Sequence, residues 1–301
     1  MRKLSWCRGV VPGRHGRHPV LAVLIVGLCL TVSAQPSSAT DGQPSLSGST
    51  AQAATLPFDP APPKSAEALF REGHFLEAAA IAEKHGTAES LAFAARATLM
   101  HAGYVAEGDE AVAELKRGEA LARRAVAKDP DMVEGLLELV IALGYHSRQE
   151  GYMQAHMDGY GKEARRLIEK AMDLAPRMGW ARAAYGGWNA EIVARGGPLL
   201  SKLAYGASRK KAIDSFEKAI AFDPDNPTIR IEYAKALIRM EPKRPDLDKI
   251  RAQLDAALSE PPKGAAERII QAQGRELLAA VNADEPSGLD KVVDRLTPFE
   301  N

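Results

Sequence analysis

Three stretches of the chain carry one pattern: residues 118–130 (GEALARRAVAKDP), 164–176 (ARRLIEKAMDLAP) and 212–224 (AIDSFEKAIAFDP). In each stretch, small or apolar residues stand at offsets 0, 4, 7 and 8, and a proline stands at offset 12. The first four offsets place these side chains on one stripe of an α-helix. Proline then ends the helix, because it has no amide hydrogen and restricts the residue before it. The pattern predicts three equivalent helices, each with one face buried against a neighbour.

The segments that follow these prolines also align with one another. A large side chain stands nine residues after each proline and a smaller one follows it; the pairs are Leu139–Val140, Tyr185–Gly186 and Tyr233–Ala234. A small residue beside a large one lets two helices approach closely, so we expect a second set of helices packed on the first. Asn226 and Pro227 fit the N-cap and the first position of such a helix. A weaker fourth copy of the pattern keeps Ala256 and Pro261.

The alanine five residues before each proline resembles the second-helix signature of the tetratricopeptide repeat (TPR) family; the pairs are Ala125/Pro130, Ala171/Pro176 and Ala219/Pro224. Residues 73–78 (GHFLEA) are similar to the turn between that family's two helices. The resemblance covers about residues 65–261 and implies an all-α solenoid of helix pairs. The first helix of a pair follows a proline, and the second helix precedes one. Helices at about 263–282 and 287–296 are expected to cap the last repeat.

The spacing departs from that family in one respect. Its repeat has about 34 residues, whereas the prolines here lie 46 and 48 residues apart. We therefore expect insertions between first and second helices at about 144–160 and 192–209. Residues 195–198 (RGGP) lack the spacing of a phosphate-binding loop and predict a break in a long helix.

Residues 186–219 are also weakly similar to two divergent branches of the TPR family. One branch is the regulator-of-microtubule-dynamics proteins, and the other is the helical accessory proteins of periplasmic solute transporters. A secretory signal is incompatible with a direct role on microtubules, so the first resemblance implies the fold alone.

Residues 1–34 have the three parts of a secretory signal peptide. Residues 1–19 carry basic side chains and no acidic one, residues 20–34 (VLAVLIVGLCLTVSA) are apolar, and Val32-Ser33-Ala34 offers the small residues at which signal peptidase cuts. The apolar run is shorter than the ~20 residues that a membrane-spanning helix needs. We expect cleavage after Ala34, a periplasmic or secreted bacterial protein, and no membrane span after cleavage. The alternative is an uncleaved anchor.

Residues 35–64 are rich in Ser, Gly, Pro, Gln and Ala and lack apolar periodicity, which predicts a disordered linker. The repeat domain is then expected over residues 65–301. Without residues 1–34 the chain has 34 basic and 39 acidic residues, a net charge of −5. This charge argues against a nucleic-acid-binding protein, which needs a basic surface.

Both cysteines, Cys7 and Cys29, lie within the predicted signal peptide. The mature chain would therefore have no disulfide, no thiolate nucleophile and no cysteine metal ligand. The sequence contains no HExxH, no G-x-S-x-G and no P-loop motif. We expect a protein that needs no cofactor and is not an enzyme.

The first insertion offers one candidate metal site. Met153, His156 and Met157 fall on one helical face by three- and four-residue spacing. Methionine sulfur and imidazole are ligands that suit Cu(I), which an exported protein can meet. The alternative is that the methionines pack the insertion against the repeats, since methionine commonly fills irregular gaps.

Four further residues are candidates for partner binding. Trp180 and Trp188 lie on one expected first helix, and Arg182 and Arg230 hold the same position in successive repeats. Stacked repeats would align the two arginines into a ladder that binds carboxylates. The alternatives are core packing for the tryptophans and solvated surface positions for the arginines.

These observations favour an exported TPR-type scaffold that binds a protein or peptide partner in the bacterial envelope. The alternative is a small-ligand-binding or transporter-accessory protein, in which the inserted helices close the groove into a pocket. An open groove would favour the first function, and an enclosed apolar pocket with few polar groups would favour the second.

Overall fold

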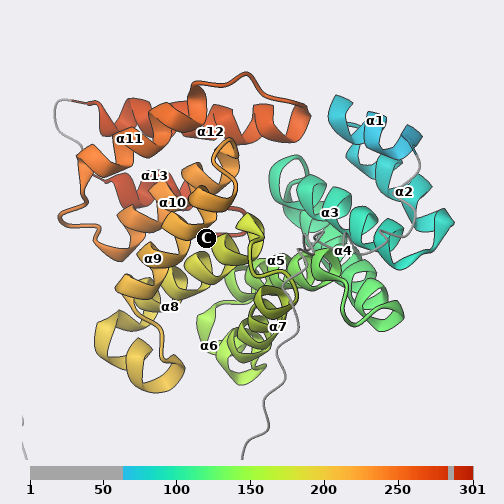
Figure 1. Cartoon of the computed structure of the whole chain (residues 1–301), viewed down its shortest axis with the longest axis horizontal. Helices are drawn as coiled ribbons and strands as arrows, with labels where there is room; N and C mark the ends of the chain where they lie inside the picture. The colour runs from blue at the N-terminus through green and yellow to red at the C-terminus, as the bar shows by residue number, and fades with distance from the viewer. Residues whose placement is uncertain (1–63, 284–287, 301) are drawn as a thin grey trace, which may run out of the picture. The chain divides into compact units, whose positions relative to one another are not determined.

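The computed structural model of the chain describes residues 64–283 and 288–300, which form thirteen α-helices and no β-strand (Figure 1). The helices are α1 (Lys64–Glu72), α2 (Phe75–His85), α3 (Ala88–Tyr104), α4 (Gly108–Lys128), α5 (Val133–Gln149), α6 (Tyr152–Met157), α7 (Tyr160–Leu174), α8 (Gly179–Tyr205), α9 (Arg209–Phe222), α10 (Pro227–Met240), α11 (Leu247–Leu258), α12 (Ala265–Val281) and α13 (Leu289–Arg295). The all-α prediction is confirmed. The predicted signal peptide (residues 1–34) and the predicted linker (residues 35–64) lie outside the described residues, except that Lys64 begins α1.

Three second helices carry the repeated sequence pattern. Helices α4, α7 and α9 each end two residues before a repeat proline. The alanines of the three endings, Ala125, Ala171 and Ala219, have no exposed surface. In each case the residue that follows the helix donates its N–H to the carbonyl oxygen of this alanine. The pattern therefore predicted both the buried face and the end of each helix.

First helices α3, α5, α8 and α10 pack against second helices α4, α7, α9 and α11. The predicted close approach occurs at Gly186, where a Cβ would lie 2.7 Å from the ring of Phe216 on α9. The fourth copy of the pattern is out of register by one residue. Ala257 is buried there, while Ala256 is half-buried, and α11 ends three residues before Pro261, whereas the other second helices end two residues before their prolines.

Both predicted insertions are present as helix. The first forms α6, and the second extends α8 as far as Tyr205. Gly197 has a φ of +67° inside α8, and Pro198 follows it. Such a φ favours glycine, and proline removes a helical hydrogen bond. The break predicted at residues 195–198 is therefore a kink within α8.

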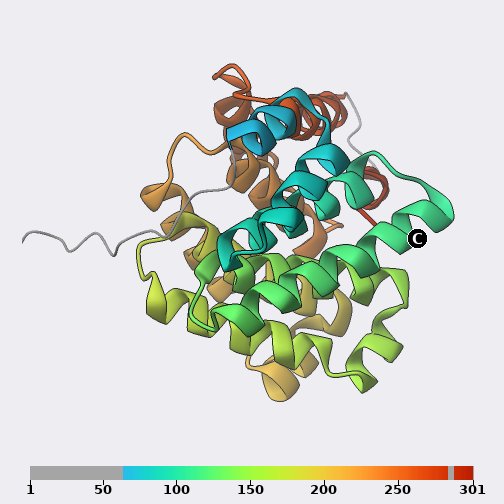
Figure 2. The same cartoon turned by 90° about the vertical axis from the view of Figure 1, so that its right-hand side faces the viewer.

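The curve of the repeats brings α1 beside α12, as Figures 1 and 2 show. A Cβ on Gly73, in the turn between α1 and α2, would lie 3.1 Å from the Cβ of Ala265. A Cβ on Gly264 would lie 3.3 Å from the backbone of Arg71. The two glycines therefore allow the first helix pair to contact the start of α12.

The predicted C-terminal helices are present as α12 and α13, and they share a core with α10. The chain after α13 does more than cap the last repeat. Residues 296–300, which we call the C-terminal tail, reach the first helices α3 and α5. Pro298 lies against Gly103 of α3, and the ring centroids of Phe299 and Tyr145 of α5 are 5.2 Å apart. None of the helices in the described residues combines the length and the apolar character that a membrane crossing requires.

Candidate functional site

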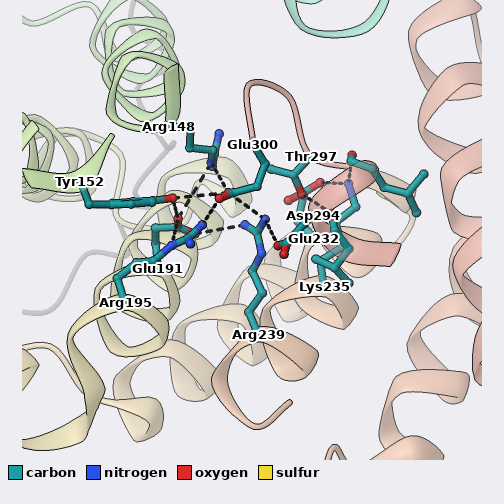
Figure 3. Close-up of polar contacts among 12 residues, drawn as sticks. Arg148, Tyr152, Glu191, Arg195, Glu232, Lys235, Arg239, Asp294, Thr297 and Glu300 are labelled. Carbon is teal, nitrogen blue, oxygen red and sulfur yellow. Dashed lines mark hydrogen bonds and ion pairs between the residues drawn. The ribbon is translucent and has the colours of Figure 1, made fainter. Parts of the chain in front are cut away.

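Three arginines from first helices of successive repeats meet at one place (Figure 3). Arg148 lies near the end of α5, Arg195 lies in α8 just before its kink, and Arg239 lies near the end of α10. We call these three residues the arginine site. Arg239 exposes 11% of its side chain and Arg148 exposes 18%, whereas Arg195 exposes 34%. Guanidinium groups brought together and shielded from water in this way require negative partners.

One partner of the arginine site is the carboxylate of Glu300, from the C-terminal tail. Its Oε2 lies 3.1 Å from Nη2 of Arg239 and 3.7 Å from Nε of Arg148. Its Oε1 pairs with Nη2 of Arg195, and the hydroxyl of Tyr152 donates to Oε2 at 3.4 Å. Only 6% of the Glu300 side chain is exposed. The carboxylate is thus held by four side chains from α5, α6, α8 and α10.

The other partner is Glu191 of α8, which lies between the same arginines. Its Oε2 accepts from Nη1 of Arg239 at 3.1 Å, and its Oε1 lies 3.3 Å from Nε of Arg195. The single hydroxyl hydrogen of Tyr152 is shared between this Oε1 and Oε2 of Glu300. Burial alone would raise the pKa of Glu191, but the charges of Arg148 and Arg239 outweigh it and lower the pKa to about 2. Glu191 is therefore ionised at neutral pH and orients the guanidinium groups.

Lys235 of α10 holds the backbone of the C-terminal tail. Its Nζ donates to Glu232 at 2.9 Å, to Gln273 at 2.9 Å and to the carbonyl oxygen of Leu296 at 3.3 Å. Only 3% of the Lys235 side chain is exposed. Burial would raise the pKa of Glu232, but the Lys235 charge lowers it overall. The tail is therefore bound through its backbone as well as through its carboxylate.

Aromatic groups complete the contacts of the tail. The Phe299 ring packs on Tyr145, and the guanidinium of Arg148 lies over the same tyrosine ring at 5.8 Å. The guanidinium of Arg195 lies 4.0 Å from the centre of the Tyr152 ring. A pocket of about 580 Å³ adjoins the tail, and residues such as Val112 and Gln149 line it. The tail thus contacts α3, α5, α8 and α10, which are the first helices of four successive pairs.

The balance of charge at this site depends on α13 and the tail together. Four cations are present: Arg148, Arg195, Lys235 and Arg239. Four carboxylates pair with them: Glu191, Glu232, Asp294 and Glu300. The last two belong to the end of α13 and to the tail, and the repeat helices alone supply four cations against two carboxylates.

The structure places Arg182 and Arg230 away from the arginine site. Each arginine donates to the carbonyl oxygen of the proline six residues before it; these prolines are Pro176 and Pro224. Arg230 also donates to Gln253 of α11 at 3.0 Å. The repeated arginine position thus has a repeated local contact, which ties the start of a first helix to the preceding turn. The carboxylate-binding ladder of the two arginines stays a prediction.

The two predicted tryptophans have different surroundings. Trp180 exposes 40% of its surface and is accessible to a partner. Trp188 exposes 9%, its Nε1 donates to the carbonyl oxygen of Gly161 at 2.9 Å, and its ring stacks on Tyr185. Trp188 therefore packs α8 against the start of α7, and its indole N–H has a hydrogen-bond acceptor within the chain.

The candidate metal ligands lie on α6. Met153 and Met157 expose 77% and 65% of their surface, so they do not pack the insertion against the repeats. Nδ1 of His156 is hydrogen-bonded to the hydroxyl of Tyr205. Within the described residues, no group of three or more His, Cys, Asp or Glu side chains is arranged to hold a metal ion. Copper binding by the two methionines and His156 stays a prediction.

No protein-family model and no curated protein matches the sequence. A solved structure does match: a thermophilic TPR protein in Thermus thermophilus is similar over 71% of this chain and 96% of that chain, with a TM-score of 0.50 and 21% sequence identity. At this identity the likeness concerns the fold. The chain has the fold of a TPR-like α-helical repeat protein.

Proposed function

We propose that this protein is a scaffold that binds a partner protein or peptide on its first helices, and that it acts by binding rather than by catalysis. A single observation carries the proposal. The five-residue C-terminal tail lies across four first helices, and three arginines hold its carboxylate. A surface that holds one short peptide segment through backbone, aromatic and charged contacts has the chemistry to bind another.

We further propose that binding takes place in the bacterial envelope. The basic, apolar and small-residue parts of residues 1–34 support export. The partner would then be an envelope or secreted protein. An unidentified protein or peptide is favoured over a nucleic acid, because the chain without residues 1–34 has a net charge of −5.

The small-ligand alternative has less support. Ligand pockets are commonly enclosed and mostly apolar. The pocket beside the tail contains the charged residues Glu107, Asp109 and Arg295 in its lining. This surface is better suited to a hydrated polar segment than to an apolar ligand.

Cross-linked co-purification from the envelope fraction tests the proposal. The bait is the full chain, and the informative variant is Arg195→Ala, which removes the most exposed guanidinium of the arginine site. Arg275→Ala, at an exposed position of α12, is the matched control. We expect mass spectrometry to find the same partner on wild type and on Arg275→Ala, and several-fold less of it on Arg195→Ala. Equal recovery on all three baits would contradict a partner site on the first helices.

A further inference from the structure

We propose that the C-terminal tail is an internal ligand that occupies the partner-binding site. The partner segment would carry an aromatic residue followed by a carboxylate, and it would compete with the tail for the arginine site. The inference rests on the proposed function and deepens it, because it names the chemistry of the partner segment and the contact that must open.

The contacts of the tail define what the site accepts. Glu300 supplies a carboxylate to three arginines, Phe299 supplies a ring to Tyr145, and Leu296 supplies a carbonyl oxygen to Lys235. Bidentate and charge-assisted contacts of arginine with carboxylates are strong and directional. A segment with the same groups in the same order would satisfy the same donors.

Charge gives the site its preference for an acidic segment. When the tail leaves, Glu300 no longer faces the arginine site. Among the described residues, two carboxylates, Glu191 and Asp294 of α13, then remain within 4.0 Å of its three guanidinium groups. Partly buried cations without partners are unfavourable. Departure of the tail is therefore favourable only when another carboxylate takes its place, which makes the exchange selective.

The backbone of the tail is held in a strained conformation. The N–H of Glu300 donates to the carbonyl oxygen of Thr297 at 3.3 Å, and this bond closes a turn with Pro298 and Phe299 in its centre. Phe299 has a φ of +62°, and it is the one non-glycine residue with positive φ in the described part of the chain. A bulky side chain is disfavoured in this region of φ. The arginine contacts keep the turn in place, and release of the tail relieves the strain.

A tail on the same chain competes strongly with an outside peptide. Linkage gives an internal segment an effective concentration of about millimolar order. The wild-type chain should therefore bind a free peptide weakly, and weakening the tail should strengthen that binding. A mutation that weakens the tail is thus expected to increase the affinity for the peptide, whereas a mutation in an ordinary binding site decreases it.

The probe that tests the inference is a fluorescein-labelled peptide with the sequence of residues 294–300 (DRLTPFE) and an amidated C-terminus, measured by fluorescence anisotropy. We expect full-length Glu300→Gln and Phe299→Ala to bind this probe at least about tenfold more tightly than the wild-type chain does. A probe that ends in Gln should lose this gain, and adding Arg195→Ala to Glu300→Gln should abolish it. Asp290→Asn, at an exposed position of α13, is the control and should bind as wild type does.

The two variants weaken the tail through different contacts. Phe299→Ala removes the aromatic ring and keeps every charge, whereas Glu300→Gln removes the charge and keeps the ring. Thermal melting of each variant verifies that it is folded. A second measurement uses the wild-type chain alone. Saturating concentrations of the probe should accelerate the amide hydrogen exchange of residues 296–300, because the probe displaces the tail.

Probe affinity that is equal in wild type and in both folded variants would overturn the inference. So would unchanged exchange of the tail when the probe is bound. Either result would leave the proposed function standing if Arg195→Ala still loses the co-purified partner. Recovery of the same amount of partner on Arg195→Ala as on wild type would instead contradict the proposed function itself.

Discussion

The carboxylate of Glu300 lies 3.1 Å from Nη2 of Arg239, although the two residues are 61 positions apart in the sequence. The same guanidinium contacts Glu191 of α8 and Asp294 of α13. Arg239 of α10 therefore connects three parts of the fold, which are α8, α13 and the C-terminal tail. The ion-pair network that stabilises the end of the fold is also the surface that we propose for partner binding.

The first prediction concerns stability in acid. The pKa of Glu191 is about 2 in the folded chain, against an ordinary value of 4.5. The unfolded chain therefore binds the proton first as pH falls. The stabilising contribution is complete above the ordinary pKa and is lost as the pH falls towards 2. We expect the free energy of unfolding, from urea titrations at several pH values, to fall by roughly 2–3 kcal/mol over this window through Glu191 alone.

Glu191→Gln is the matched variant for this measurement, because it keeps the size of the side chain and removes the titration. Its stability should depend less on pH between about 5 and 2 than that of wild type. A second carboxylate, Glu119, will still contribute, since its hydrogen bonds to His146 and Arg123 lower its pKa to about 2. Identical pH dependence in wild type and Glu191→Gln would contradict the role given to Glu191.

The second prediction compares two neighbouring glycines of α8. A Cβ on Gly186 would lie 2.7 Å from the ring of Phe216, whereas a Cβ on Gly187 would have no atom within 4 Å. Gly186→Ala should lower the free energy of unfolding by about 1–3 kcal/mol through overpacking. Gly187→Ala should raise it by roughly 0.5–1 kcal/mol, because alanine has the better helix propensity. Denaturant titration of both variants checks the pair, and changes of the same sign would show that α8 and α9 do not approach as described.

The third prediction separates the two tryptophans. Trp188 is buried and hydrogen-bonded, so Trp188→Ala should destabilise the chain by about 3–5 kcal/mol. Trp180 exposes 40% of its surface, so Trp180→Ala should change the stability by less than about 0.5 kcal/mol. Thermal melting followed by circular dichroism distinguishes them. Equal melting temperatures would contradict the packing of α8 on α7.

The fourth prediction concerns export. We expect signal peptidase to cut after Ala34, because basic, apolar and small residues follow one another in residues 1–34. Amino-terminal sequencing of the protein recovered from the envelope fraction of a bacterial expression host should begin at Gln35. A chain that keeps Met1 and fractionates with the membrane would contradict cleavage and favour an anchor.

The repeats could be predicted from the sequence because local spacing encodes them. Ala171 and Ala219 are buried in the last turns of α7 and α9, and Pro176 and Pro224 each stand two residues beyond the helix end. The kink at Gly197 was equally local. The helices could be predicted from apolar periodicity, small residues and proline, because each of these features affects the backbone only within a few residues along the chain.

The arginine site could not be predicted in the same way. Arg148, Arg195 and Arg239 stand at different distances from their preceding prolines, because the insertions lengthen two of the first helices. Repeat alignment instead selected Arg182 and Arg230, whose regular spacing reflects a contact with the preceding turn. Glu300 comes from the other end of the chain, and no local pattern relates it to α5. The one signal present was an arginine near the end of α5 and of α10 and at the start of the RGGP break of α8.

The most direct test of the central claim is site-specific photo-cross-linking in the envelope. A photoreactive amino acid at Gln149, which lines the pocket beside the tail, reports contact at the arginine site. The same amino acid at Lys218, an exposed position of second helix α9, is the control. We expect the Gln149 position to cross-link a partner protein through a segment that contains an aromatic residue and a carboxylate, and the Lys218 position to give none of this product. A partner that cross-links at Lys218 and not at Gln149 would contradict binding at the arginine site.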